Sequence, residues 1–236
     1  MRVITESELR EKYKKQEFTT FSLPEGVKLT PAASQFLNER RIKIIHTPLT
    51  DQEVIDLASL PQGKKPEHYT HLRGEKLIIK NHPRIRLRGK LDSFQAILIN
   101  IIIQVCEEGY ADLAQDLRGI LNYARQIMTC EVKGEPLPPL KFRDYSEQEI
   151  HELSHNPQNH FGFGHFLPDP KQGKVMASLN YLRTQIREVE LCAIDAFYSE
   201  GRVEREDIIR SLNRLSSLFY VLMLKLCAGE YKKETK

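Results

Sequence analysis

The sequence has few cysteines, and no two of them stand close together along the chain. Its 236 residues contain four, namely Cys106, Cys130, Cys192 and Cys227. Without a CxxC pair, the chain offers neither a zinc ribbon nor the framework of a disulfide-rich domain. Isolated cysteines in apolar or helical surroundings are typical of reducing compartments, so we expect a cytoplasmic protein.

Long hydrophobic runs and an excess of one charge are also missing. The longest apolar run, 96–106, is interrupted by Asn100 and Gln104 and is too short to span a bilayer, so we expect no membrane association. The first residues carry no apolar segment of the kind found in secretory signals. The formal net charge is only +3, and no basic run alternates with aromatic residues, so nothing indicates nucleic-acid binding.

Motifs for a catalytic group of the chain's own are absent as well. The sequence has no GxSxG elbow, no cysteine beside an identifiable histidine, no Walker A motif and no GxGxxG. His151 and His155, four residues apart on a predicted helix, have a spacing that can bind zinc or iron, but neither HExxH nor a nearby acidic ligand completes it. With His160 and His165 they could instead cap or pack a loop, or stack on a flat ligand, and we predict no metal site.

The first 65 residues differ in pattern from the rest of the chain. A helix begins with Thr30 as N-cap and Pro31 at its first position, and it runs into an apolar, strand-like segment at 42–45. The Pro-, Gly- and Lys-rich stretch 61–70 is typical of a linker. We therefore expect an N-terminal extension of unassigned role and a second domain, at residues 1–65 and 66–236.

The second part has a predominantly helical pattern. Apolar residues recur with helical periodicity over the segments 91–109, 111–132, 146–156, 175–199 and 204–227. The segment 91–109 is apolar on most faces and is predicted to be the most buried, with Asp92 or Ser93 near its cap. Ser146 and Glu149 fit a capping box. Long helices with mainly short connections predict a mainly α protein, built as an up-and-down helical bundle.

One predicted helix carries charges beside its core stripe. In YLRTQIREVE, Arg183, Arg187 and Glu190 are spaced i, i+4 and i+7 and therefore share one face. Exposed helices commonly carry such charges as a solvated ladder. The core stripe predicted for the same helix comprises Leu179, Leu182, Ile186, Val189 and Ile194. Charges beside a stripe of this kind favour an interface or a cleft, so the alternative to a solvated ladder is an anionic ligand.

Two other segments supply polar groups that could join this face. Lys80 stands at a predicted strand-to-helix transition, and with Arg183 and Arg187 it could clamp a polyphosphate. Asn213 lies within an otherwise apolar helix, where it needs a partner or weakens the core. It could bond a sugar or a base edge, or only join two helices, and Glu190 could orient an arginine or accept a ribose hydroxyl. A bundle, or two subunits, would be needed to assemble the set.

Several segments, taken in order, resemble one group of enzymes. They are VITESELR, LPEGVKLTPAASQFL, THLRGEKLIIKNHPR, LDSFQA, IHELSHNP, LNYLRTQIREVE and LNRLSSLFYVLM. Together they are similar to the ethanolamine-utilisation cobalamin adenosyltransferases over nearly the whole chain. From about Thr70 onward, KNHPRIRLRGKLDSF, RTQIREVE and LNRLS also resemble, more distantly, motifs of the PduO-type ATP:corrinoid adenosyltransferases.

The resemblance implies a fold, a reaction and partners. The fold would be a five-helix bundle with a small N-terminal extension, assembled as a homotrimer, or as a dimer, with active sites between subunits. The reaction would transfer the 5′-deoxyadenosyl group of ATP to Co(I) of a corrinoid and release triphosphate, in support of ethanolamine catabolism. ATP with Mg²⁺ and cobalamin would bind. Ethanolamine ammonia-lyase or microcompartment proteins would be partners, in the cytoplasm or at a bacterial microcompartment.

The resemblance also assigns residues. The ATP-binding positions of the family fall on Thr70, Lys80, Arg187, Glu190 and Asn213. Lys80 and Arg187 would stabilise the leaving triphosphate and so act in catalysis. Asp92 and Arg183 fall on a pair that bridges subunits beside ATP, and Phe166 lies near the phenylalanine that displaces the lower ligand of the corrinoid.

The chain departs from the related motifs at three points. Glu188 stands where a second arginine is expected, which makes the anion clamp less positive. THLRGEK takes the place of the Gly-Asp-x-Gly loop that wraps ATP. The His-x11-Cys-Cys-x-x-Cys motif of some ethanolamine-type members is missing, so no iron or zinc is expected there. The competing hypothesis is a non-catalytic scaffold of a microcompartment that docks through the helix at 29–44.

Overall fold

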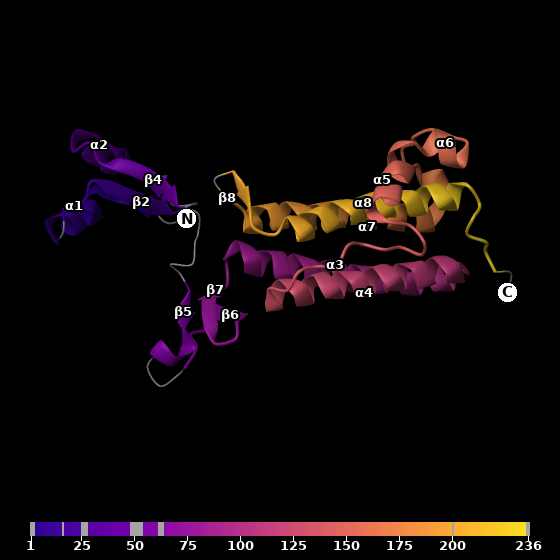
Figure 1. Cartoon of the computed structure of the whole chain (residues 1–236), viewed down its shortest axis with the longest axis horizontal. Helices are drawn as coiled ribbons and strands as arrows, with labels where there is room; N and C mark the ends of the chain where they lie inside the picture. The colour runs from indigo at the N-terminus through magenta and orange to yellow at the C-terminus, as the bar shows by residue number, and fades with distance from the viewer. Residues whose placement is uncertain are drawn as a thin grey trace. The chain divides into compact units, whose positions relative to one another are not determined.

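The computed structural model describes residues 3–15, 17–24, 28–47, 54–60, 64–199 and 201–234 (Figure 1). The chain divides into two compact units, Met1–Tyr69 with Lys76–Ile79 and Thr70–Glu75 with Lys80–Lys236. It is mainly helical, as predicted, with a few short sheets. The boundary between residues 65 and 66 stays a prediction.

The first unit combines two helices with pairs of parallel strands. Its N-terminal elements are β1 (Val3–Ile4), α1 (Glu6–Lys15), β2 (Thr20–Pro24), β3 (Lys28–Leu29), α2 (Pro31–Glu39) and β4 (Lys43–Thr47). β1 pairs with β3, and β2 pairs with β4 in the register Thr20↔Lys43. The side chains that form its core include Leu9, Phe21, Ala33, Phe36 and Leu37.

The start of α2 follows from its cap. Thr30 Oγ1 accepts a hydrogen bond from the Ala33 amide at 3.1 Å, and Pro31 occupies the first turn, where an amide would have no helical partner. The predicted helix start is therefore confirmed, and β4 confirms the strand-like segment at 42–45.

The first unit also contains a short antiparallel pair. β5 (Ile55–Asp56) pairs with β7 (Lys76–Ile79) in the register Ile55↔Leu77, and a 3₁₀ turn at Leu57–Ser59 follows β5. Of the predicted linker, residues 61–63 lie outside the described residues. Its last residues lead into β6 (Tyr69–Arg73).

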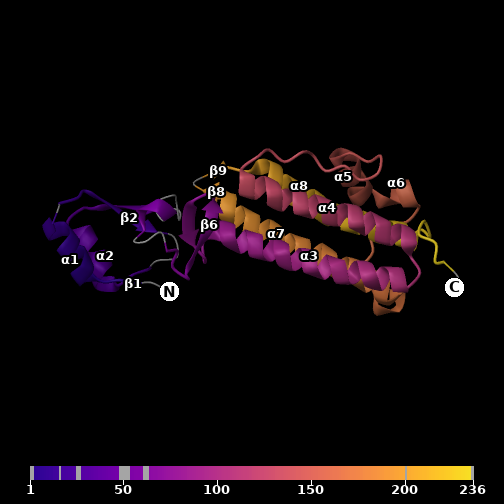
Figure 2. The ribbon, with the colours of Figure 1, turned by 90° about the horizontal axis from the view of Figure 1, so that it is seen from below.

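The second unit is built from long helices. Its elements are α3 (Pro83–Glu107), α4 (Ala111–Lys133), α5 (Glu147–His155), α6 (Pro157–Phe161), a 3₁₀ turn (Pro170–Gln172), α7 (Gly173–Phe197), β8 (Tyr198–Ser199), β9 (Arg202–Val203) and α8 (Glu206–Cys227). α7 packs against both α3 and α8, α4 packs beside α3, and α5 packs on α8 (Figure 2). The β8–β9 hairpin reverses the chain, so α7 and α8 run antiparallel.

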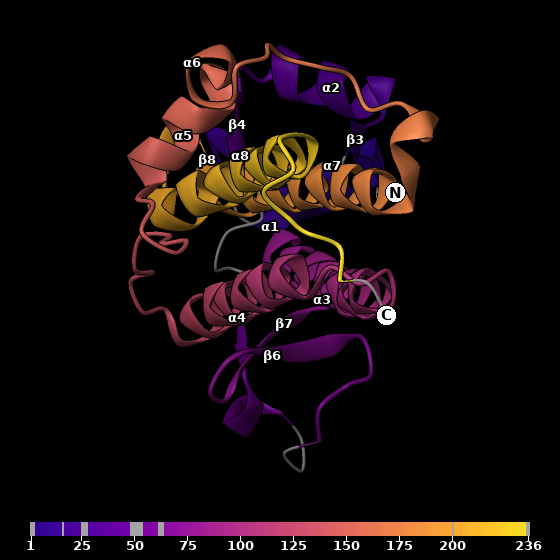
Figure 3. The same ribbon diagram turned by 90° about the vertical axis from the view of Figure 1, so that its right-hand side faces the viewer.

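The predicted helices at 111–132, 175–199 and 204–227 are confirmed to within two residues at each end. Viewed along the helices, α7 and α8 form a layer over α3 and α4 (Figure 3). Phe94 and Phe219 meet edge to face between these layers, with centroids 6.0 Å apart. The five-helix, up-and-down arrangement of the family stays a prediction.

The core stripe predicted for α7 is correct except at one residue. Four of its five residues are buried, but Ile194 is 37% exposed. Ile194 follows Glu190 by four residues, so it continues the face of the charged residues, away from the core. The prediction for Ile194 was wrong because the buried stripe continues through Ala193 and Phe197, four and eight residues after Val189.

α3 begins earlier than predicted. Its N-cap is His82, whose Nδ1 accepts from the Arg84 amide at 3.1 Å, and Pro83 stands in the first turn. Asp92 and Ser93 therefore lie inside the helix and do not cap it. The prediction was wrong because the apolar pattern starts only where the helix enters the core, some turns after its first residue.

α3 is also less enclosed than predicted. It buries seven of its 25 residues, whereas α8 buries eleven of its 22. Because α4 and α7 cover α3 from one side, Ile99 and Ile103 remain 40% and 51% exposed. Among the described helices, only α3 is long and apolar enough to cross a membrane. Core helices of soluble proteins often have the same length and composition.

A buried carboxylate on α4 fixes the first turns of α3. Glu131 is fully buried and accepts hydrogen bonds from Arg84 Nε at 2.9 Å and from Arg88 Nε. Arg88 also donates to the carbonyl oxygens of His71, at 3.1 Å, and Leu72, at 2.8 Å. This network holds the end of the helix that follows the strand-to-helix transition.

The connection from α4 to α5 is bound along α4. Arg143 donates to both carboxylate oxygens of Asp116, at 2.9 and 2.6 Å, and the Tyr231 hydroxyl donates to the same carboxylate at 2.7 Å. Ser146 and Glu149 then form the predicted capping box at the start of α5. These contacts place α5 beside α8.

Candidate functional site

A row of polar side chains lies where α7 meets α8. Arg183, Arg187 and Glu190 come from α7, and Asn213 and Tyr220 come from α8; these five residues are the α7–α8 polar row. Because the helices are antiparallel, the seven-residue spacings on each helix match. Asn213 Nδ2 donates to Glu190 Oε1 at 2.9 Å, and Tyr220 lies within electrostatic range of Arg183. The two helices therefore build one continuous polar face.

Two arginines of this row lie close to each other. Burial lowers the pKa of the half-buried Arg183, the charge of Arg187 lowers it further, and Tyr220 acts in the opposite direction. Arg183 Nε donates to Asn180 Oδ1 at 3.2 Å. Within the described ranges, neither arginine forms an ion pair with a carboxylate, and Arg187 is exposed. Two neighbouring guanidinium groups without a counter-charge favour the binding of an anion such as a phosphate.

The carboxamide of Asn213 is held from both sides. Its Nδ2 donates to Glu190, and its Oδ1 accepts from Arg214 Nη1 at 3.3 Å. Arg214 Nη1 also lies 3.1 Å from His151 Nδ1, on α5. The predicted possibility that Asn213 joins two helices is confirmed, and the joining leaves Asn213 exposed at the surface of the row.

Phe166 lies at the Tyr220 end of the row. Its ring stacks on Tyr220 with centroids 5.9 Å apart, and its amide donates to the Tyr220 hydroxyl at 3.3 Å. His165 stacks on the same ring, and its Nδ1 lies 3.2 Å from the hydroxyl. Its Nε2 lies 3.1 Å from the His155 carbonyl oxygen, to which it can donate. The irregular segment after α6 is thus attached to α8 and α5.

The remaining predicted site residues lie elsewhere on the second unit. Lys80 precedes α3 and is exposed, Asp92 is exposed on α3, and Thr70 is partly exposed in β6. Over the part of the chain that the structure describes, no hydrogen bond or ion pair joins any of the three to the α7–α8 polar row. The single chain thus assembles the predicted residues of α7 and α8 with Phe166, and leaves these three apart.

Glu188 lies on a different face from Arg187. Successive helical residues are turned by about 100°, so Glu188 does not share the face of Arg187. Burial raises the pKa of Cys192, Glu188 adds to the rise, and Lys90 of α3 lowers it. Glu188 therefore belongs to the surroundings of Cys192 and Lys90.

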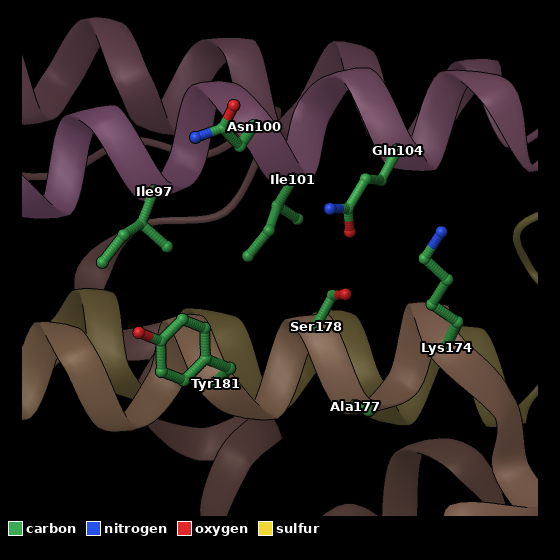
Figure 4. Close-up of a pocket in the computed structure, with 8 residues that line it drawn as sticks. All are labelled: Ile97, Asn100, Ile101, Gln104, Lys174, Ala177, Ser178 and Tyr181. Carbon is green, nitrogen blue, oxygen red and sulfur yellow. The ribbon is translucent and has the colours of Figure 1, made fainter.

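A groove of about 420 Å³ lies between α3 and α7. Ile97, Ile101 and Gln104 point into it from α3, and Tyr181, Ser178 and Lys174 point into it from α7 (Figure 4). Its walls are largely apolar, and exposed isoleucines of α3 lie next to it in the sequence. The groove is separate from the polar row, because the groove lies between α3 and α7 and the row lies where α7 meets α8.

The histidines predicted to be a possible metal-binding pair lie next to each other. The rings of His151 and His155 have centroids 4.0 Å apart. In the residues that the structure describes, no three His, Cys, Asp or Glu side chains gather closely enough to hold a metal ion. Burial lowers the pKa of His151, and Arg214 and His155 lower it further, so the neutral form of His151 is favoured.

Sequence reasoning missed one residue of the site and one contact beside it. Tyr220 stands seven residues after Asn213 and so shares its helical face, a spacing that could have identified it. The pairing of Arg214 with His151 joins residues 63 positions apart, and no local pattern indicates it.

The comparisons with known proteins identify the family of the chain. A family model described as cobalamin adenosyltransferase matches residues 62–226, which is more than half of the chain. The chain therefore belongs to the cobalamin adenosyltransferase family of enzymes. A second model, described as the corrinoid adenosyltransferase EutT N-terminal domain, matches residues 3–50.

Curated relatives extend this result over almost the whole chain. The chain is 33% identical to the corrinoid adenosyltransferase EutT of Escherichia coli (strain K12), over 94% of this chain and 91% of the relative. It is 32% identical, over the same shares, to the corrinoid adenosyltransferase EutT of Salmonella typhimurium (strain LT2). The resemblance seen in the sequence is confirmed, at both its N-terminal and its helical part.

Proposed function

We propose that this enzyme transfers the 5′-deoxyadenosyl group of ATP to the Co(I) ion of a corrinoid and releases triphosphate. The observation that supports it best is Arg187, an exposed arginine without a carboxylate partner among the described residues, in one row with Arg183 and the Glu190–Asn213 pair. A polyphosphate needs such cationic donors, and a nucleoside needs hydrogen-bonding groups beside them. Membership in the cobalamin adenosyltransferase family supports the corrinoid as acceptor.

In this reaction, the cobalt ion is the nucleophile, so the chain need not supply one. The electron pair of Co(I) forms the bond to C5′ while the bond from C5′ to oxygen breaks, and triphosphate leaves with the electron pair of the broken C5′–O bond. Arg187 and Lys80 would stabilise the charge that develops on the leaving oxygens. Asn213 and Glu190 would bind the nucleoside through hydrogen bonds, which contribute to the affinity for ATP. Mg²⁺ is expected to accompany the triphosphate as a hard cation with oxygen ligands.

Phe166 is proposed to face the corrinoid. The structure supports this because the ring is half-buried on Tyr220, at the arginine end of the row. An aromatic side chain at this place can occupy the lower face of the corrinoid and keep water and the lower ligand from cobalt.

We further propose that the active site is completed by a second subunit of a homotrimer. Among the described residues, Lys80, Asp92 and Thr70 form no hydrogen bond or ion pair with the row of their own chain, which is expected if they serve the row of a neighbour. The exposed isoleucines of α3 and the groove beside it give α3 an apolar face of the kind that subunit interfaces bury (Figure 4).

The relatives' name supports a physiological setting in ethanolamine catabolism. The adenosylated cofactor would pass to ethanolamine ammonia-lyase, and the N-terminal unit would serve contacts with that enzyme or with microcompartment proteins. The competing scaffold hypothesis predicts docking through this unit without any binding of ATP.

One spectroscopic experiment tests the proposed reaction. Cob(II)alamin is mixed with the protein, and its absorption spectrum is recorded with and without ATP and Mg²⁺. We expect a distinct species lacking the lower ligand only when ATP is present. After reduction, adenosylcobalamin and triphosphate should form in equal amounts. A spectrum that ATP leaves unchanged, together with no product, would refute the activity and favour the scaffold.

Arg183→Ala tests the proposed subunit interface. Arg183 is expected to pair with Asp92 of a neighbouring subunit, so its loss should shift sedimentation toward smaller species and lower activity in parallel. Asp92→Ala should have the same effect, and the double variant should be no worse than either single one. Arg125→Ala, an exposed position on α4, is the matched control. An unchanged sedimentation profile and activity in Arg183→Ala would contradict the interface.

A further inference from the structure

We infer that Arg214 is a positioning residue for the nucleotide site, held in place by a neutral His151 on α5. This rests on the proposed function, because Asn213 is taken to contact ATP. Arg214 lies between His151 and Asn213, so it links a helix outside the polar row to the carboxamide inside it.

The first step concerns the orientation of Asn213. A carboxamide can turn by 180° and exchange its donor and acceptor groups at little cost unless neighbours distinguish them. Here Glu190 can only accept when ionised, and Arg214 can only donate. With Nδ2 at 2.9 Å from Glu190 and Oδ1 at 3.3 Å from Arg214, one orientation is satisfied and the turned one would face donor with donor and acceptor with acceptor. Arg214 and Glu190 together therefore determine which atoms Asn213 presents to a ligand.

The second step concerns what holds Arg214. Its Nη1 is a donor, so His151 Nδ1, at 3.1 Å, must be the acceptor, which requires the neutral imidazole with its proton on Nε2. The charged or titratable groups that act on His151 are Arg214 from α8 and His155 and Glu152 from its own helix. Arg214 and His155 disfavour a proton on His151, whereas the carboxylate of Glu152 favours it.

The third step follows from the sign of this effect. As pH falls through the pKa of His151, Nδ1 gains a proton, ceases to accept and repels the guanidinium. Arg214 then loses one of its two anchors, and Asn213 loses one of the two groups that fix its orientation. We expect the KM for ATP to rise at acid pH while kcat changes little, because Arg214 does not touch the reacting atoms.

The test compares Arg214→Gln with Arg210→Gln. Arg210 lies one turn earlier on α8 and is exposed, with its ion pair to Glu147 at 3.8 Å, so it is a matched control. Arg214→Gln should raise the KM for ATP about tenfold, the effect typical of a lost hydrogen bond from a charged group. Its kcat should stay within about twofold of the parent, and Arg210→Gln should leave both constants unchanged. A KM that Arg214→Gln leaves at the parent value would overturn the inference.

His151→Asn gives a second, independent variant. The asparagine can offer an oxygen near the place of Nδ1 and does not titrate, so it should keep the parent KM at neutral pH and remove the rise at acid pH. Comparing the two pH profiles separates His151 from the titration of ATP itself. A profile in His151→Asn that still rises as in the parent would overturn the role of His151.

NMR titration of the histidine rings provides a readout that needs no ATP. Removing the Arg214 charge should raise the pKa of His151, and removing Arg210 should not. If Arg214→Gln leaves that pKa unchanged, the inference fails and the proposed function stands. If instead Asn213→Ala leaves the KM for ATP unchanged, the proposed nucleotide site fails, and the inference with it.

Discussion

Replacing Arg187 with alanine should lower kcat by about a hundredfold or more, even at saturating ATP. The guanidinium of Arg187 is exposed, has a like charge as its neighbour and has no carboxylate partner among the described residues. Its charge is therefore available to the triphosphate, and its interaction grows as negative charge develops on the leaving oxygens. The loss of one preorganised donor of this kind typically costs about two to three orders of magnitude in rate.

The fold of Arg187→Ala should remain intact, because an exposed residue without partners contributes within about 0.5 kcal/mol to stability. Turnover would be measured from the formation of adenosylcobalamin under single-turnover conditions, with far-UV circular dichroism as the test of folding. Arg210→Ala, on the exposed side of α8, controls for the loss of one positive charge. Near-parent turnover in Arg187→Ala would remove Arg187 from the catalytic assignment.

Replacing Glu131 with alanine should lower the free energy of unfolding by about 3–5 kcal/mol. Its carboxylate is fully buried, and the side chains of Arg84 and Arg88 around it are only 14% and 15% exposed. Removing the shared counter-charge leaves two guanidinium groups with little access to water, of which Arg84 keeps only the exposed Glu204, at 3.6 Å. Breaking a buried ion pair from one side is costly for this reason.

Urea unfolding followed by circular dichroism would measure this change. Glu135→Ala is the matched control, because Glu135 lies four residues further along the chain and its side chain is 58% exposed. Its ion pair with Lys133 spans 4.0 Å at the surface, and we expect a change of less than about 0.5 kcal/mol. Equal unfolding midpoints for Glu131→Ala and the parent would show that the network contributes no net stability.

The parts of the fold that could be predicted are those that depend on neighbours in the sequence. The capping box of Ser146 and Glu149, the cap at Thr30 and the periodicity of α7 and α8 are all local patterns, and all are confirmed. The burial of α3 could not be predicted in this way. An apolar helix buried in the core and one with an exposed apolar face can have the same composition. Ile99 and Ile103 therefore led to the wrong prediction that α3 is the most buried helix.

The candidate site shows the same division. The shared face of Arg183, Arg187 and Glu190 follows from helical spacing, and the partner that Asn213 needed proved to be Glu190. The contact of Arg214 with α5 depends on how the α4–α5 connection is bound along α4, which no single segment specifies. The roles of Lys80 and Asp92 beside the row depend on the proposed assembly of subunits, so they stay predictions.

The matching seven-residue spacings on α7 and α8 also fix a length. Seven residues advance about 10 Å along a helix, so the Glu190–Asn213 pair and the Arg183–Tyr220 end are held about that far apart. Two rigid helices fix this distance, and the loop that carries Phe166 contacts Tyr220 at one end of the row. One residue inserted into either helix between these points would turn every later side chain by about 100° and put the two ends out of phase. The spacing between the ends of the site is therefore set by backbone geometry, while the chemistry at each end remains free to vary.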